Sequence, residues 1–277
     1  MLAGREVALA VLTRRGRPAA AIVAAGAVAG FDSVTLRLIE PKTGDHGDLV
    51  HDRRARRDLT TQLADAGMGL LDVEVVRLRP DTDVRGLLPA LDAAAELGAR
   101  FVLTVCEDPE EGRFVATFGR LAAACRDRGL RAVLEFMRFS ECHSLEHAVR
   151  LVRCVRERGG DVGVLVDALH LQRSGGSAGQ VAIYAEQDPT LFPYVQLCDA
   201  PPTPPRGGVA ELRTEAVAGR LLPGTGELPL GELLAALPAD IPACIETPVR
   251  GLEALRDDER AAAAYRSAAG VLATART

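Results

Sequence analysis

The sequence contains no tryptophan, and aromatic residues make up only 4% of its 277 residues. Large rings therefore cannot fill the core, so leucine, valine, isoleucine and alanine must do so. Parallel sheets that are buried on both faces favour this filling. Apolar residues reach 48%, which is enough for a large core. The length suits one α/β barrel of roughly 250 residues.

The six cysteines form no C-x-x-C pair. We expect free, buried thiols in a reducing compartment, the cytoplasm. No apolar stretch approaches the roughly 18 residues that a membrane span needs without a breaker. The first residues run directly into a strand-like segment, so we expect no signal peptide and no membrane association.

Lysine is nearly absent, and acidic residues outnumber basic ones, with a net charge of −5 and a pI of about 5.6. Such a balance provides no general attraction to nucleic acid or to anionic lipid. We therefore expect no nucleic-acid partner. The sequence leaves the oligomeric state open, with a homo-oligomer as one option.

Short apolar runs alternate with helical stretches along the whole chain, mostly at intervals of ~30 residues, the size of a βα unit. The expected strands are Val7–Leu12, Ser33–Leu38, Leu71–Leu78, Arg100–Val105, Ala132–Phe136, Val162–Asp167, Tyr194–Cys198 and Ile241–Glu246. The expected helices are Arg17–Gly30, Arg53–Gly67, Asp83–Gly98, Glu110–Arg128, 144–158, Ala178–Glu186, Leu230–Leu237 and Leu252–Ala273. Eight such units in strict alternation predict an α/β fold, a single (β/α)8 TIM barrel domain over residues 1–277.

One interval is longer than the others, between the seventh and the eighth expected strand. It begins with four prolines within residues 200–207. Two interpretations stay open, an ordered cover over the barrel mouth and a rigid surface loop.

Polar side chains stand at the ends of the last four expected strands: Glu135, Asp167, Gln196 and Glu246. The carboxyl ends of neighbouring barrel strands share one rim, so these side chains are expected to converge. Three carboxylates raise one another's pKa unless a cation neutralises them. An all-oxygen ligand set suits Mg or Mn best, and Zn or Co is compatible. A lone carboxylate at a strand end also serves as a helix cap or an arginine partner, but four in succession favour a metal site.

His170 and Asp199 each follow one of these strand ends by three residues. His170 is a candidate metal ligand or general acid/base. Asp199 is either a substrate-binding residue on the rim or a loop cap.

Further candidates for substrate binding lie in the N-terminal half. His46 and His51 fall in the second βα loop, where they either contact substrate or are solvated. Arg37 and Arg77, near strand ends, either bind a phosphate, carboxylate or carbonyl of the substrate or pair with Glu74.

Five segments together resemble the xylose isomerase-like barrels, a family that includes sugar phosphate isomerases and epimerases, inosose and 3-dehydroshikimate dehydratases, and endonuclease IV. They are LEFMRF at 134–139, VDALHLQRSGG at 166–176, VQLCDAP at 195–201, RLLPGTGELPL at 220–230 and IETP at 245–248. The resemblance covers about half of the chain. It implies a carbohydrate-like substrate and a divalent metal held by Glu135, Asp167, Gln196 and Glu246, with His170 beside it.

The sequence departs from that family at Glu215-Ala216-Val217, where the nearest relatives have arginine after Glu-Ala. Either Arg213 or Arg220 replaces that arginine as a substrate-binding residue, or the substrate differs. The endonuclease branch is disfavoured, because its site is rich in histidine and this chain has only five.

Three functions remain open. The first is an isomerase or epimerase acting on a keto-sugar, sugar phosphate or keto-polyol through a metal-stabilised enediolate, with Glu135 and Glu246 exchanging the proton. The second is a dehydratase of the 3-dehydroshikimate or inosose type, with His170 as acid or base. The third is a degenerate, non-catalytic barrel.

Overall fold

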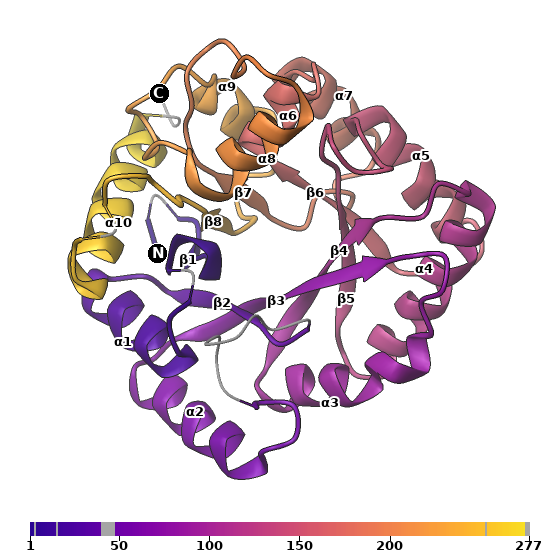
Figure 1. The fold of residues 1–277 in the computed structure, drawn as a ribbon, viewed down its shortest axis with the longest axis horizontal. Helices are drawn as coiled ribbons and strands as arrows, with labels where there is room; N and C mark the ends of the chain where they lie inside the picture. Colours follow the sequence, from indigo (N-terminus) through magenta and orange to yellow (C-terminus); the bar gives the residue numbers. More distant parts are fainter. Residues whose placement is uncertain (3, 15, 40–47, 253, 275–277) are drawn as a thin grey trace.

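Eight parallel strands close into a barrel in chain order, β1 to β8 (Figure 1). The structure is a computed structural model that describes residues 1–2, 4–14, 16–39, 48–252 and 254–274. The strands are β1 Val7–Leu9, β2 Ser33–Arg37, β3 Gly69–Leu78, β4 Ala99–Cys106, β5 Arg131–Glu135, β6 Val162–Asp167, β7 Val195–Leu197 and β8 Ala243–Ile245. Pairing of β1 with β8 closes the ring, with Ala8 opposite Cys244. The predicted TIM barrel is confirmed.

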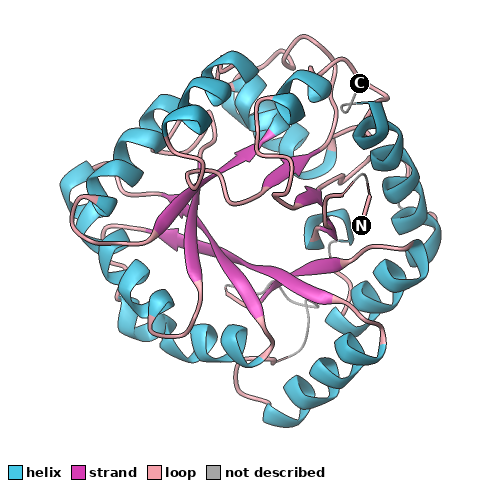
Figure 2. Cartoon of the chain, turned by 180° about the vertical axis from the view of Figure 1, so that it is seen from behind, coloured by secondary structure: helices cyan, strands magenta, loops and turns pink. Residues whose placement is uncertain are grey.

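Helices surround the strands, as Figures 1 and 2 show from opposite sides. The α-helices are α1 Ala19–Ala29, α2 Arg53–Asp65, α3 Leu88–Glu96, α4 Glu111–Arg126, α5 Leu145–Arg156, α6 Ala168–Arg173, α7 Ala178–Gln187, α8 Val209–Ala218, α9 Leu230–Ala235 and α10 Asp257–Thr274. Two 3-10 turns, η1 Val11–Arg14 and η2 Val84–Leu87, complete the described elements. None of these helices is both long enough and apolar enough to cross a membrane.

The scarcity of aromatic residues shapes the core as expected. Between barrel and helices lies a large layer of mostly leucine, valine and alanine, while a smaller cluster inside the barrel includes Ala8, Ala10 and Leu165. Tyr194 is the largest member of the inner cluster, and its hydroxyl donates to Asp72 Oδ2 at 2.7 Å. All six cysteines are free, and five of them are buried.

Strict alternation was wrong in two places. Helix α6 follows β6 at once, since the Asp167 side chain accepts the His170 backbone N–H and caps its first turn. Helix α8 lies in the proline-rich interval, where its N-cap, Gly208, makes no side-chain cap hydrogen bond. Helix α6 is a single short segment that directly follows a strand, and α8 has no clear apolar periodicity, so sequence patterns do not detect them.

Several element boundaries also differ from the predicted ones, and two of them have a visible cause. The first strand ends at Leu9 rather than Leu12, because the chain turns into η1. The last helix begins at Asp257 rather than Leu252, and the Arg256 backbone N–H just before it donates to the Glu259 side chain.

An ion pair attaches α8 to the barrel. Arg173, at the end of α6, makes two hydrogen bonds to the Glu215 carboxylate, at 2.6 and 2.8 Å, and a third to the Pro201 carbonyl at 2.9 Å. Both members of the pair are buried. Because β6 leads directly into α6, the pair holds α8 over the same end of the barrel that carries the polar strand ends.

Candidate metal centre

The four polar strand ends converge at one rim. Glu135 and Asp167 are the last residues of β5 and β6, Gln196 pairs with Asp167 in register, and Glu246 directly follows β8. All four are at most 6% exposed. Ligand oxygens of Glu135, Asp167 and Glu246 lie within 4.8 Å of one another. In the part of the chain that the structure describes, no other group of three or more metal-ligating side chains is as close.

A buried arginine lies among these acids. Arg220 donates from one terminal nitrogen to Asp167 Oδ2 at 2.5 Å, and the other lies 2.7 Å from Glu246 Oε2. Its Nε donates to the Ala216 carbonyl at 2.7 Å, which ties the side chain to α8. The guanidinium thus binds two of the three carboxylates.

His170 lies against the third carboxylate. Its Nε2 is 3.8 Å from Glu135 Oε1, and its ring meets the Phe139 ring edge-on at 5.6 Å. The His170 backbone N–H donates to Asp167 Oδ1 at 2.9 Å. The first turn of α6 therefore positions both the Asp167 carboxylate and the residue that carries the imidazole.

Burial dominates the electrostatics of the centre. It raises the pKa of Glu135, with Glu246 and Asp167 adding to the effect, and it raises the pKa of Glu246 to about 8 against the pull of Arg220. Burial alone would raise the pKa of Asp167, but Arg220 and His170 outweigh it and lower that pKa. Burial lowers the pKa of His170 to about 4, so the imidazole is neutral at pH 7.

The residues fit a divalent cation. Metal ligation requires deprotonated carboxylates, and in that state the three acids and one guanidinium leave two uncompensated negative charges in a buried site, the charge that one divalent ion would cancel. Gln196 donates from Nε2 to Glu246 Oε1 at 3.3 Å, yet its own Oε1 is buried without a partner. A buried amide oxygen left unpaired costs free energy, and coordination would recover it.

A cavity of about 140 Å³ opens above the acids. Glu135, Glu246, His170 and Arg220 line it, as does Glu74. Because four side chains able to transfer a proton, the three glutamates and His170, face this one space, the inner cavity is suited to acid–base chemistry.

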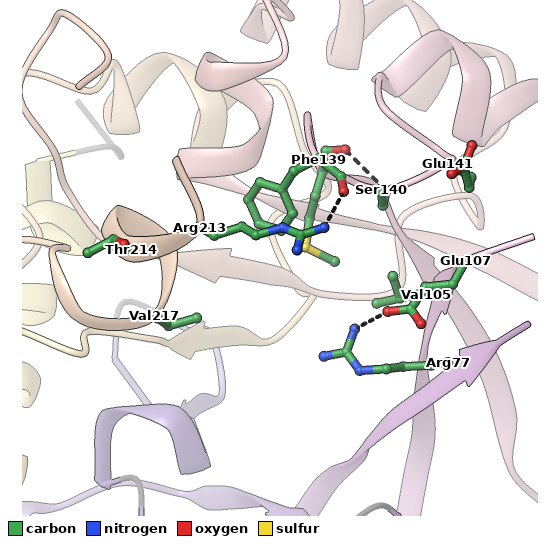
Figure 3. Close-up of a pocket in the computed structure, with 10 residues that line it drawn as sticks. Arg77, Val105, Glu107, Phe139, Ser140, Glu141, Arg213, Thr214 and Val217 are labelled. Atoms are coloured by element: carbon green, nitrogen blue, oxygen red, sulfur yellow. Dashed lines mark hydrogen bonds and ion pairs between the residues drawn. The ribbon is translucent and has the colours of Figure 1, made fainter. Parts of the chain in front are cut away.

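A second cavity, of about 470 Å³, adjoins the first and shares five lining residues with it. Figure 3 shows Arg213 lying along Phe139 on one side and Arg77 paired with Glu107 on the other. Val217 points into the space from α8 (Figure 3). Inner and outer cavities together reach the size of ordinary ligand pockets, 300–1,000 Å³.

The candidate substrate-binding residues fall into two groups. Arg37 and Arg220 line the inner cavity, Arg213 lines the outer one, and Arg77 lines both. Arg37 forms an ion pair with Glu74 at 2.7 Å, which was one of the two alternatives left open. Arg77 forms an ion pair with Glu107.

The remaining candidates lie away from these cavities. His51 is exposed, and its backbone N–H donates to Asp48 Oδ1. Asp199 is buried, and its two oxygens accept backbone N–H groups of residues 200, 224 and 228, so it organises the following loop. His46 lies outside the described residues.

Sequence reasoning missed several residues of the cavities. Met137 and Phe139 follow β5 and line both cavities, and Val217 does so from α8. The signal for the first two was their position just after Glu135, in the βα loop that forms a barrel mouth. For Val217 there was no clear signal, because α8 has no clear apolar face and no side-chain cap.

Comparisons with known proteins agree with the fold. The solved structures that share it include these three. A fusion of a xylose isomerase-like TIM barrel with 4-hydroxyphenylpyruvate dioxygenase is 22% identical, with a TM-score of 0.77, over 95% of this chain and 42% of that one. The IolI protein with a bound zinc atom is 16% identical, with a TM-score of 0.79, over 97% and 98%. A D-allulose 3-epimerase from Methylomonas sp. is 16% identical, with a TM-score of 0.68, over 96% and 97%.

This chain thus spans less than half of the fusion protein. A search of curated proteins finds no match. The profile of one family, described as the xylose isomerase-like TIM barrel, matches residues 23–274, which is most of the sequence. The chain therefore belongs to the xylose isomerase-like TIM barrel family.

Proposed function

We propose that this protein is a divalent-metal-dependent isomerase or epimerase of a keto-sugar or keto-polyol. The observation that carries the proposal is the buried trio of Glu135, Asp167 and Glu246, whose oxygens lie within 4.8 Å of one another and of which Glu135 and Glu246 line a cavity. Gln196 would complete the ligand set. The zinc atom in the IolI structure and the sugar epimerase of the same fold support this reading.

The metal and the two glutamates would have separate roles in the reaction. Bound metal would act as a Lewis acid that polarises a carbonyl and acidifies the neighbouring C–H. Glu135 and Glu246 reach the cavity from β5 and from the end of β8. One carboxylate would take the proton from carbon and the other would return it, either to the neighbouring carbon or to the opposite face. Both carboxylates are at most 6% exposed, so little bulk water reaches the proton that they would exchange.

A second candidate is a dehydratase, which the position of His170 favours. Its imidazole is neutral, lines the inner cavity and lies 3.8 Å from Glu135. It would take the proton next to the carbonyl, or deliver one to a departing β-hydroxyl. Products separate the two functions, because dehydration removes one water and creates a conjugated chromophore, whereas epimerisation conserves mass.

The proposal is tested by metal content and turnover together. Purified protein is stripped with chelator, reloaded with Mn, Mg, Zn or Co, and incubated with D-allulose, an inosose or 3-dehydroshikimate, with products read by NMR and mass. We expect turnover only after reloading, and Glu246→Gln to lose both metal and turnover. Full activity in stripped protein, or unchanged metal content in Glu246→Gln, would overturn it.

A further inference from the structure

Arg220 is the one buried cation in contact with the trio among the described residues. Only 2% of the residue is exposed, and three acceptors fix its guanidinium: Asp167 Oδ2, Glu246 Oε2 and the Ala216 carbonyl. A buried charge is tolerated only when it is paired, and here both partners are proposed metal ligands. The arginine is thus part of the charge balance of the centre.

We propose that Arg220 is a positioning residue that sets the net charge of the metal centre and so favours divalent over trivalent ions. This inference rests on the metal site proposed above. With Arg220 in place, a divalent ion makes the buried cluster neutral, whereas a trivalent ion leaves one positive charge in a medium of low dielectric. A neutral side chain at position 220 removes that discrimination.

The geometry gives Arg220 a second effect, on the direction of the ligands. Arg220 binds one oxygen of Asp167 and one of Glu246. The other oxygens of these two acids are also held, because Asp167 Oδ1 accepts the His170 backbone N–H and Glu246 Oε1 accepts from Gln196 Nε2. Both carboxylates are therefore held from two sides. Loss of the planar guanidinium fork should weaken the binding of every ion. Loss of its charge should change the relative affinities for divalent and trivalent ions.

These two effects can be separated, because the Coulomb energy between Arg220 and an ion scales with the charge of the ion. At an effective dielectric of about 20 and a separation of about 5 Å, removal of one positive charge favours a trivalent over a divalent ion by more than about tenfold. Lysine retains the charge and loses the fork, whereas methionine loses both.

The experiment measures Mn²⁺ and Tb³⁺ affinities by calorimetry on chelator-treated protein, for wild type, Arg220→Met and Arg220→Lys. Arg213→Met is the control, since it removes the same charge at an exposed position on the neighbouring helix α8. We expect the ratio of Tb³⁺ to Mn²⁺ affinity to rise at least about tenfold in Arg220→Met. It should stay within about twofold of wild type in Arg220→Lys and Arg213→Met, even where both affinities fall. Circular dichroism monitors folding, and Arg220→Gln, also neutral but polar, replaces Arg220→Met if that variant does not fold.

An unchanged ratio in the neutral variant overturns the charge role of Arg220, as does an equal rise in Arg220→Lys. Wild-type protein that binds neither ion is a different result, because it removes the metal site itself. The two failures are therefore distinguishable.

Discussion

Two regions enclose the candidate site, and they are built differently. The floor consists of Glu135, Asp167, Gln196 and Glu246, which the strands of the barrel position by backbone pairing. The cover is helix α8, which contributes Arg213 and Val217 and carries Arg220 directly after it. Side-chain ion pairs position the cover, through Arg173 to Glu215 and through Arg220 to the floor.

This difference separates the residues expected to carry the chemical step from those expected to set stability and substrate affinity. A barrel rim fixes its side chains through a closed ladder of hydrogen bonds, so the floor tolerates change in the loops. The cover depends on two arginines, so one substitution there alters shape and charge together. Floor variants should therefore affect the chemical step, and cover variants should affect stability and substrate affinity.

The largest effect is expected for Glu135→Gln on the floor. The amide cannot exchange a proton and is a weaker metal ligand, so turnover should fall by about 10²–10⁴-fold, the range for loss of a general acid or base. Steady-state kinetics on the metal-reloaded protein measure it. Glu146→Gln, an exposed acid in the first turn of α5, is the control and should retain turnover. Equal turnover in Glu135→Gln would remove this residue from the mechanism.

Arg173→Met tests the cover. It leaves the Glu215 carboxylate buried without its partner, which typically costs 3–5 kcal/mol, so the free energy of unfolding should fall by about that amount. Urea denaturation measures the change. Arg206→Met, at an exposed position in the same interval, should have an effect within about 0.5 kcal/mol. If α8 needs no anchor, the two variants will be equally stable.

The floor was predictable from sequence and the cover was not, for a physical reason. A buried apolar run followed by a carboxylate is a local signal, and closure of eight units places successive strand ends side by side. Asp167 and Glu246 were found in this way. The orientation of Val217 and the burial of Arg220 depend on α8, whose sequence has no clear apolar face and no side-chain cap. Its helical state follows from tertiary contacts, which no local pattern records.

Asp199 shows a limit of the positional argument. Like His170 it follows a strand-end residue by three positions, yet the chain after β7 turns so that its oxygens accept backbone N–H groups. Spacing along the sequence locates a residue near the rim. Only the path of the loop decides whether its side chain faces the cavity or the backbone.

Below the floor, Asp72 provides a smaller test, of stability against pH. Burial raises its pKa well above the usual value, and Glu74 adds to this. The folded state therefore binds this proton more tightly than the unfolded chain. Its contribution to stability is full below about pH 4, the ordinary aspartate pKa, and declines as pH rises. Between pH 4 and 7 the Tm of wild type should fall more steeply than that of Asp72→Asn, which can still accept from Tyr194. Parallel curves would show that folding does not raise the pKa of Asp72.

The smallest effect is expected for Val217→Ala, at the edge of the cover. The residue is 41% exposed and lines both cavities, so its two lost methyl groups are only partly buried even when substrate is bound. With ~0.8 kcal/mol per fully buried methylene-sized group, KM should rise by no more than about fivefold while kcat is unchanged. Steady-state kinetics with the substrate found in the turnover screen provide both constants. A fall in kcat similar to that of Glu135→Gln would mean that the cover takes part in the chemical step, and the division between floor and cover would then be wrong.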